Sequence, residues 1–496
     1  MAFCGIDVGT QGVRAAILAA DGSLLGSGAA TMHSDNRGHG RHEQDPDDWW
    51  AALCVATTAS VEQAAQHGVA ADEIRAIALD ATSGTVLVED AHGAPTGPAL
   101  MYDDARAAEQ ATRAQRLGAG LWHDLGYSMQ PTWALPKIMW LLAADALPAG
   151  GRIAHQSDHL VRRLCGEPVA TDTSNALKSG VDLRSVRWPA DLFAELGVPV
   201  TALPNVVLPA GELGHVDGAA ARETGLPAGA LVRAGMTDGC AAQIASGALA
   251  TGNWSSALGT TLVVKGSTAE LLRDPSGAVY CHRHPDGGWL PGGASSSGAR
   301  VIATTFDHAS PADLDALTRR AASLVPVPGV TYPLTGRGER FPFVAADAVG
   351  FVSSGATDDA ARFGSLCQAV AYVERLAYDV LAGLGADVSG AVALTGGATR
   401  NDWWNQLRAD VLGRACVLPA SAQAATGMAV LAAAEPGELT ATAGRMIAYT
   451  GRLEPDAERH AALTAGYLDL VGELTDRGWL DASVAQHATD TAAVHS

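Results

Sequence analysis

Lysine is scarce in this sequence. Only Lys137, Lys178 and Lys265 occur among 33 basic residues, and 53 acidic residues give a formal net charge of −20. Nucleic-acid binding depends on clustered Lys and Arg that neutralise phosphates, so this balance argues against a nucleic acid as partner. A multiply anionic substrate would need local binding groups and a metal ion, because the field of the whole protein repels it.

Long apolar runs and an export signal are also missing. The apolar segment 241–250 is interrupted by Gln243 and Ser246, and no stretch approaches the roughly 18 apolar residues of a membrane-spanning helix. No basic region or cleavage-like stretch precedes the first strand-like segment, so we expect no signal peptide. Seven cysteines, scattered from Cys4 to Cys416 without a CxxC pair, indicate reduced thiols. We therefore expect a cytoplasmic protein that does not contact a membrane.

Two common phosphate-binding motifs are absent. A Walker loop requires glycine directly before Lys-Ser, but Leu177 precedes Lys178 in NALKSG. No GxGxxG follows a strand, since GRGERF ends in Phe341. A nucleotide-binding protein with this sequence must hold phosphate by another route.

What is present indicates a large α/β protein. At 496 residues the chain is too long for one hydrophobic core. Strand-like and helix-like segments alternate, which predicts sheets covered by helices. Segment 46–65 is a predicted helix with Asp45 as its cap and Pro46 at its first position.

Two similar hairpins stand about half a chain apart. In GIDVGTQGVR, strands Phe3–Ile6 and Val13–Leu18 flank a turn at 7–12. Glycine and a polar residue are all that a hairpin turn needs, so this motif alone favours an ordinary turn. The segment NWSSALGTTLVVKG at 253–266 repeats the pattern. Aligning the two Gly-Thr pairs suggests two related domains and places Ala257 where Asp7 stands, so only the first turn carries a carboxylate.

A glycine-rich turn follows in the second half. Segment 363–386 is a predicted helix, and 390–413 reads as a strand, a Gly396-Gly397 turn and a helix that begins near Asn401. Glycines at such a turn let the backbone approach a ligand, and a helix N-terminus favours anionic or polar groups. From about Glu454 the chain reads as a polar helical tail.

Asp238 stands on a further turn, between a strand and a helix of small residues in LVRAGMTDGCAAQIASGAL. Taken alone, an aspartate before GCAAQIA reads as a helix N-cap. The second hairpin begins shortly downstream, and this order gives the aspartate another interpretation.

The order of these segments resembles the ASKHA superfamily, and the Asp238 turn closely resembles its FGGY carbohydrate kinases, over nearly all of residues 3–450. The resemblance implies two actin-like (ribonuclease H-like) ATPase domains with a cleft between them that closes during the reaction. An N-terminal domain would span 1–245, a C-terminal domain 246–450 and a helical tail 451–496.

The family also implies roles for individual residues. Asp238 would be the catalytic base, and Asp7 would hold Mg2+ through water. Arg14 would stabilise the transition state, or simply point outward from its strand. The residues expected to bind ATP are Gly9, Thr10, Gln11, Arg14, Gly259, Thr260, Thr261, Gly396, Gly397, Ala398 and Asn401.

Several segments resemble the subgroup that phosphorylates D-ribulose, which is related to plant and cyanobacterial xylulose-kinase-like proteins. These segments are DATSGTVLV at 80–88, LMYDDAR at 100–106, SDHLVRRLCG at 157–166, SNALKSG at 174–180, GGWLPGGASSSG at 287–298 and YPLTGRGERFP at 332–342. Standard xylulokinases have Trp-Asn-Asp-Gly-Arg where this chain has Tyr102-Asp103-Asp104-Ala105-Arg106. Ser83, Asp104, Arg106 and Asp238 are the expected sugar-binding residues, although Asp104 and Arg106 also fit a surface ion pair.

Three alternatives stay open. The substrate could be D-xylulose, L-ribulose, glycerol or another sugar or polyol. The output could be conformational, as in an ASKHA chaperone or filament ATPase, or the protein could bind a sugar without turnover. A homodimer is an open alternative to a monomer.

Two histidine-rich segments do not match the ligand spacing of a zinc site, and we expect solvated loops there. One contains His33, His39 and His42, and the other contains Cys281, His282 and His284.

Overall fold

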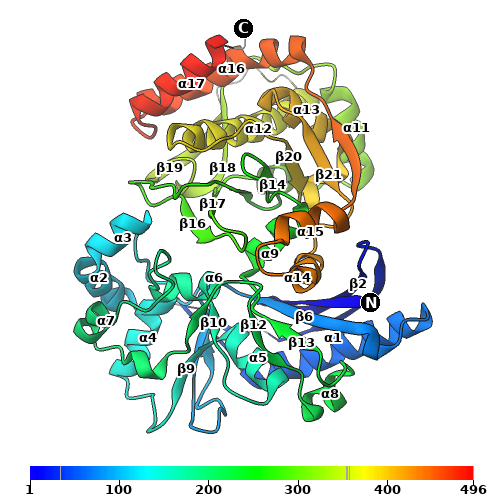
Figure 1. The fold of residues 1–496 in the computed structure, drawn as a ribbon. Coiled ribbons are helices and arrows are strands. Elements are labelled where there is room, and N and C mark those ends of the chain that lie inside the picture. Colours follow the sequence, from blue (N-terminus) through cyan, green and yellow to red (C-terminus); the bar gives the residue numbers. More distant parts are fainter. Residues whose placement is uncertain (34, 39, 353–355, 357, 495–496) are drawn as a thin grey trace. The chain divides into compact units, whose positions relative to one another are not determined.

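The computed structural model describes residues 1–33, 35–38, 40–352, 356 and 358–494, and the chain divides into two compact units (Figure 1). Unit 1 contains Met1–Gly247, His282–Leu290 and Ser421–Ala448, and unit 2 contains Ala248–Cys281, Pro291–Ala420 and Tyr449–Ser496. Each unit is built around a mixed sheet with helices, which confirms the predicted α/β class.

The main sheet of unit 1 has six strands in the order β12-β13-β6-β1-β2-β3. Strands β1, β6 and β13 are parallel, and β2 is antiparallel to β1 and β3. The strands are β1 (Ala2–Val8), β2 (Gly12–Ala19), β3 (Leu24–Thr31), β6 (Ile74–Ala81), β12 (Glu212–His215) and β13 (Leu231–Arg233).

Helices cover this sheet. The predicted helix at 46–65 is α1 (Pro46–Gln66), with Asp45 as its N-cap, and it packs against β2 and β3. Helix α9 (Asp238–Ser246) packs on α14 (Ala424–Ala433), which lies against β1 and β6 (Figure 1). A Cβ at Gly5 would lie 1.9 Å from the Ala425 carbonyl oxygen, so glycine permits this close approach. Residues 421–448, assigned to the second domain by the sequence analysis, thus pack with unit 1.

The rest of unit 1 carries the loops that matter below. A five-stranded sheet consists of β4 (Asp35–Gly38), β5 (Arg41–Gln44), β8 (Ala99–Leu100), β7 (Val86–Glu89) and β9 (Arg152–His155). A separate two-stranded sheet is formed by β10 (Thr171–Asp172) and β11 (Val206–Val207). The remaining helices are α2 (Ala108–Leu117), α3 (Ala119–Leu125), α4 (Ala134–Ala143), α5 (Gln156–Cys165), α6 (Thr173–Ala176), α7 (Ala190–Leu196), α8 (Gly218–Thr224) and α15 (Leu439–Met446).

The second large sheet, most of whose residues belong to unit 2, has seven strands in the order β16-β17-β15-β14-β20-β21-β22. They are β14 (Trp254–Leu258), β15 (Leu262–Gly266), β16 (Tyr280–Arg283), β17 (Trp289–Ala294), β20 (Val392–Thr395), β21 (Cys416–Pro419) and β22 (Tyr449–Leu453), and a separate hairpin is formed by β18 (Thr331–Glu339) and β19 (Ala345–Val352).

The helices of unit 2 are α10 (Arg300–Thr305), α11 (Pro311–Ala321), α12 (Asp359–Gly383), α13 (Asp402–Leu412), α16 (Ala457–Asp476) and α17 (Ala482–Val494). Helix α12 is buried along most of its length. The expected polar tail forms α16 and α17, which pack on α12 and α13 through buried residues such as Tyr467.

The two units repeat one motif. Strand β1 is antiparallel to β2 and parallel to β6, and β14 is antiparallel to β15 and parallel to β20. Asp7 pairs with Asp80, whereas Ala257 pairs with Thr395 at the equivalent place. The duplicated hairpin is therefore present, and its carboxylate belongs to unit 1.

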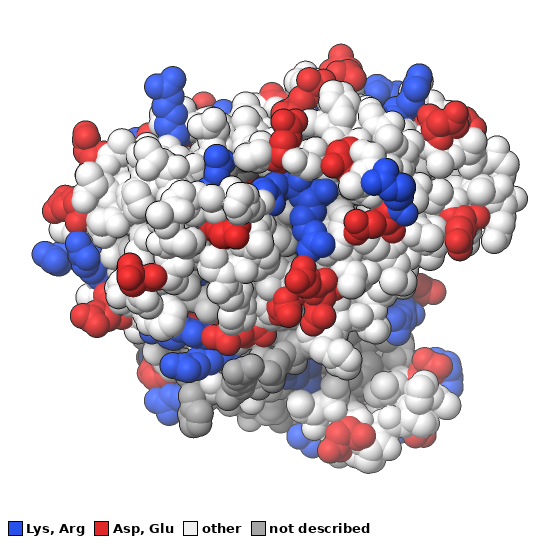
Figure 2. Space-filling model, turned by 90° about the horizontal axis from the view of Figure 1, so that it is seen from below, with Lys and Arg blue, Asp and Glu red and all other residues white. Residues whose placement is uncertain are grey.

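In the described part of the chain, no helix is long and apolar enough to cross a membrane. On the face shown in Figure 2, acidic and basic side chains alternate among uncharged ones, and the described residues form no broad basic patch there.

Candidate functional site

Three aspartates lie at the carboxyl end of the unit 1 sheet. The parallel register of β1 and β6 pairs Asp7 with Asp80. A bridge pairs the next residue, Ala81, with Thr237, which directly precedes Asp238. The carboxyl ends of parallel strands share one edge of a sheet, and α/β proteins bind ligands there. The strand register therefore brings all three carboxyl groups to a ligand-binding edge.

These carboxyl groups influence one another. Asp80 is fully buried, and burial raises its pKa well above the usual range; the charges of Asp7 and Asp238 raise it further. Burial also raises the pKa of Asp7, and the neighbouring charge of Arg14 offsets part of that rise. Neither carboxyl oxygen of Asp80 has a hydrogen-bond partner among the described residues. Burial and the two neighbouring carboxylates therefore favour the protonated form of Asp80.

Hydrogen bonds fix the turn between β1 and β2. The Gly9 amide donates to the Gly12 carbonyl over 3.1 Å, and Nε2 of Gln44 on β5 donates to the Thr10 carbonyl over 2.8 Å. The Gln11 side chain is exposed. The turn thus has a defined shape before any ligand binds.

Arg14 was expected either to stabilise the transition state or to point outward from its strand, and its side chain is both near Asp7 and exposed. Its Nη1 lies 3.4 Å from Oδ2 of Asp7, yet 59% of its side chain is exposed. An exposed guanidinium beside a carboxylate remains accessible to an anionic ligand.

Asp238 is the first residue of α9, and Thr237 occupies the N-cap position. The exposed Asp238 carboxylate accepts a hydrogen bond from the Gly239 amide over 2.7 Å. Behind it, the Thr237 amide donates to Oγ of Ser174 over 3.1 Å, and this hydroxyl also lies 2.9 Å from Nδ1 of His282. A buried network therefore fixes the backbone that presents Asp238.

Ser83 follows the end of β6 at the same edge. Its hydroxyl is shielded from water and has no hydrogen-bond partner among the described residues. Its carbonyl accepts a hydrogen bond from Nζ of Lys178 over 3.1 Å. Shielded hydroxyl groups are rarely left unpaired, which is consistent with a ligand at Ser83.

Asp104 and Arg106 bind each other. Asp104 is completely buried, and its Oδ2 lies 2.6 Å from Nη2 of Arg106 and accepts the His42 amide over 2.9 Å. Arg106 also bonds Glu43 over 2.7 Å and lies over the Trp140 ring. The ion pair is present, but it is buried rather than on the surface. It supports the loop of Tyr102, whose side chain is 40% exposed.

The second hairpin, in unit 2, is closed by similar bonds. The Gly259 amide donates to the Thr261 carbonyl over 3.1 Å, and the Gly259 carbonyl accepts the Ala299 amide over 2.9 Å. The Arg300 amide donates to the Thr260 carbonyl over 3.3 Å, which ties the turn to the start of α10.

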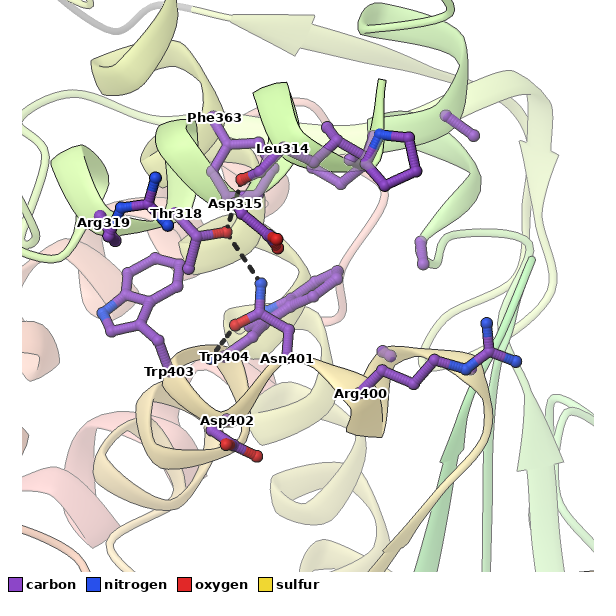
Figure 3. Close-up of a pocket in the computed structure, with 16 residues that line it drawn as sticks. Leu314, Asp315, Thr318, Arg319, Phe363, Arg400, Asn401, Asp402, Trp403 and Trp404 are labelled. Carbon is purple, nitrogen blue, oxygen red and sulfur yellow. Dashed lines mark hydrogen bonds between the residues drawn. The ribbon is translucent and has the colours of Figure 1, made fainter. Parts of the chain in front are cut away.

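A cavity of about 640 Å³ lies in unit 2 (Figure 3). Gly397, Ala398 and Asn401 line it, together with residues of α10, α11, α12 and α13. Gly396 precedes them with a φ of +86°, and a Cβ there would lie 2.5 Å from the Leu258 carbonyl oxygen. Glycine at this turn therefore brings the cavity wall against β14, the strand that leads into the second hairpin.

Asn401 builds the cavity wall. Its Oδ1 accepts the Trp404 amide over 3.0 Å, and its Nδ2 donates to Oγ1 of Thr318 over 3.0 Å (Figure 3). Both ends of the amide are thus used to cap α13 and to link it with α11.

A buried ion pair joins this helix to the second hairpin. Nε of Arg408 lies 2.7 Å from Oε2 of Glu374, and both side chains are fully buried. Nη2 of Arg408 donates to Oγ of Ser256 over 2.9 Å. Helices α12 and α13 are therefore connected to β14.

Asp7 fits a hydrated magnesium ion. Mg2+ keeps several waters and is bound through one or two carboxylates together with substrate phosphates. Asp7 is 9% exposed at the sheet edge, where Asp238 also stands. Among the described residues, no group of three or more His, Cys, Asp or Glu side chains could hold a metal ion by itself. The donor set thus suits an ion that shares its ligands with water and phosphate.

The prediction of solvated loops is wrong for three of the histidines. His42 is 5% exposed, and His282 and His284 are each 2% exposed. Each has a polar partner on Nδ1, which makes burial less costly: the His42 ring lies 2.6 Å from Oδ1 of Asp103, the His282 ring lies 2.9 Å from Oγ of Ser174, and the His284 ring accepts the Asp286 amide over 3.0 Å. His33 is exposed, and His39 lies outside the described residues.

Asp80, Lys137 and Lys178 were not predicted to be functional from the sequence. Nζ of the fully buried Lys137 donates to the Met101 carbonyl over 2.6 Å, at the base of the Tyr102 loop. The scarcity of lysine could have drawn attention to Lys137 and Lys178. These two of the three lysines bond the loops that carry Tyr102 and Ser83.

Comparison with known proteins agrees with this arrangement. The N-terminal domain model of the FGGY family of carbohydrate kinases matches residues 2–245, and the C-terminal domain model matches residues 255–435. A xylulose kinase from Streptomyces rubiginosus is 29% identical over 497 residues, covering 96% of this chain and 97% of that protein. One from Streptomyces coelicolor is 32% identical over 432 residues and covers 84% of each chain.

Solved structures show the same fold. The crystal structure of a xylulose kinase from Rhodospirillum rubrum superposes with a TM-score of 0.85 at 23% identity, covering 96% of this chain and 99% of that one.

Proposed function

The chain belongs to the FGGY family of carbohydrate kinases, and from this premise we propose that it transfers the γ-phosphate of ATP to the primary hydroxyl of a ketopentose. The preferred sugar is D-ribulose, and D-xylulose is the second candidate. The observation that carries the proposal is the exposed Asp238 carboxylate at the sheet edge that also carries Asp7. Tyr102, where xylulokinases have tryptophan, favours D-ribulose, whereas the names of the relatives favour D-xylulose.

Asp238 acts as the base. The sugar's primary hydroxyl oxygen attacks the γ-phosphorus, its proton passes to the Asp238 carboxylate, and ADP leaves. Phosphoryl transfer depends mainly on positioning and charge stabilisation. The network of Thr237, Ser174 and His282 supports this role, because it fixes the backbone from which the carboxylate projects.

Asp7 would hold Mg2+ through water, and the bound ion would neutralise phosphate charge. The Arg14 guanidinium beside Asp7 offsets part of the rise in the pKa of Asp7 that burial causes. Arg14, beside Asp7, would contact the anionic phosphate.

Unit 2 would bind the nucleotide. The amides and hydroxyls of the Gly259 turn suit phosphate oxygens, and the cavity beside Gly397 and Asn401 would take adenosine. Asn401 contributes by shaping this cavity, since its amide already bonds Trp404 and Thr318. The cytoplasmic location expected from the sequence is part of the proposal and is supported by the seven unpaired cysteines.

A panel of acceptors with ATP and Mg2+ tests the proposal. D-ribulose, D-xylulose, L-ribulose, glycerol and D-gluconate would be compared by ADP release in a coupled assay. We expect the highest kcat/KM with D-ribulose. A higher value with D-xylulose would move the assignment to the alternative, and ATP turnover that no sugar accelerates would replace it with an ATPase of conformational output.

A further inference from the structure

A 2-ketopentose that reacts at its fifth carbon must be in its open-chain form. The furanose ring of such a sugar uses the oxygen of the fifth carbon, so that oxygen can attack ATP only when the ring is open. The ketone at the second carbon is then free, and a ketone oxygen accepts hydrogen bonds but donates none. A site for this substrate needs a group that only donates, and the ammonium of lysine is such a group.

Lys178 stands where such a donor is needed. Lys178 is half-buried, whereas the other nine residues of segment 171–180 are all buried. One of its three N–H groups donates to the Ser83 carbonyl over 3.1 Å. Among the described residues, no carboxylate forms an ion pair with Lys178. Its ammonium therefore keeps donor capacity beside the Ser83 hydroxyl, which is itself unpaired among those residues.

The surrounding backbone is adapted to this lysine. Gly84 has a φ of +97°, and a Cβ there would lie 3.1 Å from Cδ of Lys178. A larger residue at Gly84 would be strained and would press on the lysine side chain. Glycine at position 84 therefore lets the Lys178 side chain pack against the β6–β7 turn and reach the Ser83 carbonyl.

The position relative to Asp238 follows from the strand register. Ser83 comes two residues after Ala81, which pairs with Thr237, and Asp238 follows Thr237 directly. Lys178 and Asp238 therefore serve the same edge of the unit 1 sheet. Lys137 lies close enough to Lys178 to be affected by its charge. Burial is the main reason that the pKa of Lys137 falls to about 7, and the positive charge of Lys178 lowers it further.

We propose that Lys178 is a further substrate-contacting residue, whose ammonium donates a hydrogen bond to the ketone oxygen of the open-chain sugar. The inference rests on the proposed function and deepens it, because it makes Lys178 the residue that distinguishes a ketose from the pentitol of the same length. The hydroxyl that a pentitol carries in place of the ketone can accept the same bond, but its own O–H needs an acceptor, which the Lys178 ammonium cannot supply.

The test compares binding of D-ribulose and ribitol, measured by titration calorimetry without ATP, in the wild type and in Lys178→Met. A lost hydrogen bond to a charged group weakens binding roughly tenfold to a hundredfold. We expect that loss for D-ribulose and less than about a threefold change for ribitol. The KM for the ketose should rise by the same factor, while the KM for ATP stays unchanged.

Two further variants keep the test decisive. Lys178→Arg retains a donor-only cation and should recover part of the preference for the ketose. Arg113→Gln removes an exposed cation of unit 1 whose side chain donates to the Glu195 carbonyl over 2.8 Å, and it should leave both affinities unchanged. Should Lys178→Met fold poorly, Lys178→Gln is measured in its place.

The outcomes separate two failures. Equal weakening of D-ribulose and ribitol, or no weakening of either, overturns the role of Lys178. Absence of phosphorylation of any ketopentose by the wild type overturns the proposed function instead.

Discussion

Asp80 lies opposite Asp7 in the parallel register of β6 and β1, and both oxygens of its carboxyl group are shielded from water. Burial and the charges of Asp7 and Asp238 raise the pKa of Asp80 and so favour its protonated form. A neutral acid in this place adds no negative charge where phosphate would bind.

The neutral state of Asp80 predicts the effect of its substitution. Asp80→Asn supplies an amide donor of nearly the same shape, so kcat/KM should stay within about fivefold of the wild type, whereas Asp80→Ala removes the donor and leaves a cavity and should lower it by roughly tenfold or more. Steady-state kinetics on both variants check this. If Asp80→Asn is as impaired as Asp80→Ala, Asp80 acts as a charged group and the assignment is wrong.

Lys137 predicts a pH dependence of stability. Burial lowers its pKa to about 7, whereas an unfolded lysine titrates near 10.4. The folded protein therefore binds this proton less tightly than the unfolded chain, and the Lys137 contribution to stability increases as the pH rises from about 7 towards 10.

A comparison with Lys137→Met isolates this contribution. Between about pH 7.5 and about pH 9, the free energy of unfolding of the wild type should increase relative to that of the variant by on the order of 2 kcal/mol. Urea unfolding at several pH values measures the difference. A difference that stays constant over this range would show that Lys137 keeps an ordinary pKa.

The Arg408–Glu374 pair predicts non-additive losses of stability. Removing one partner leaves a buried charge uncompensated, so Glu374→Leu and Arg408→Met should each destabilise unit 2 by about 3–5 kcal/mol. The double variant should lose less than the two single losses combined, because no buried charge remains. Guanidinium unfolding of the three variants provides the measurement, and strictly additive losses would contradict the coupling.

Much of the fold could be predicted from local patterns. Alternating apolar residues around a Gly-Thr turn indicated both hairpins, and β1, β2, β14 and β15 form there. The Asp45 cap and Pro46 marked the start of α1, where the helix begins. Such signals depend on neighbouring residues and need no knowledge of tertiary contacts.

Features that depend on distant contacts could not be predicted. Residues 421–448 pack with unit 1 because Gly5 and Gly427 permit close approach of α14 to β1 and α9, which no local pattern reveals. Asp80 reads as the polar end of a strand, and its burial beside Asp7 follows only from strand pairing. Asp104 and Arg106 are two residues apart, but their burial depends on Glu43 and His42 from another strand.

The most direct test of the account follows the phosphate itself. Phosphorus NMR of a mixture of ATP, Mg2+ and D-ribulose would identify the product formed by the wild type and by Asp238→Ala. We predict a ketose 5-phosphate in equal amount to ADP with the wild type, and a rate lower by roughly 10²–10⁴-fold or more in the variant, which should still bind ATP and sugar. Inorganic phosphate as the only product, or near-normal sugar phosphorylation by Asp238→Ala, would contradict the account.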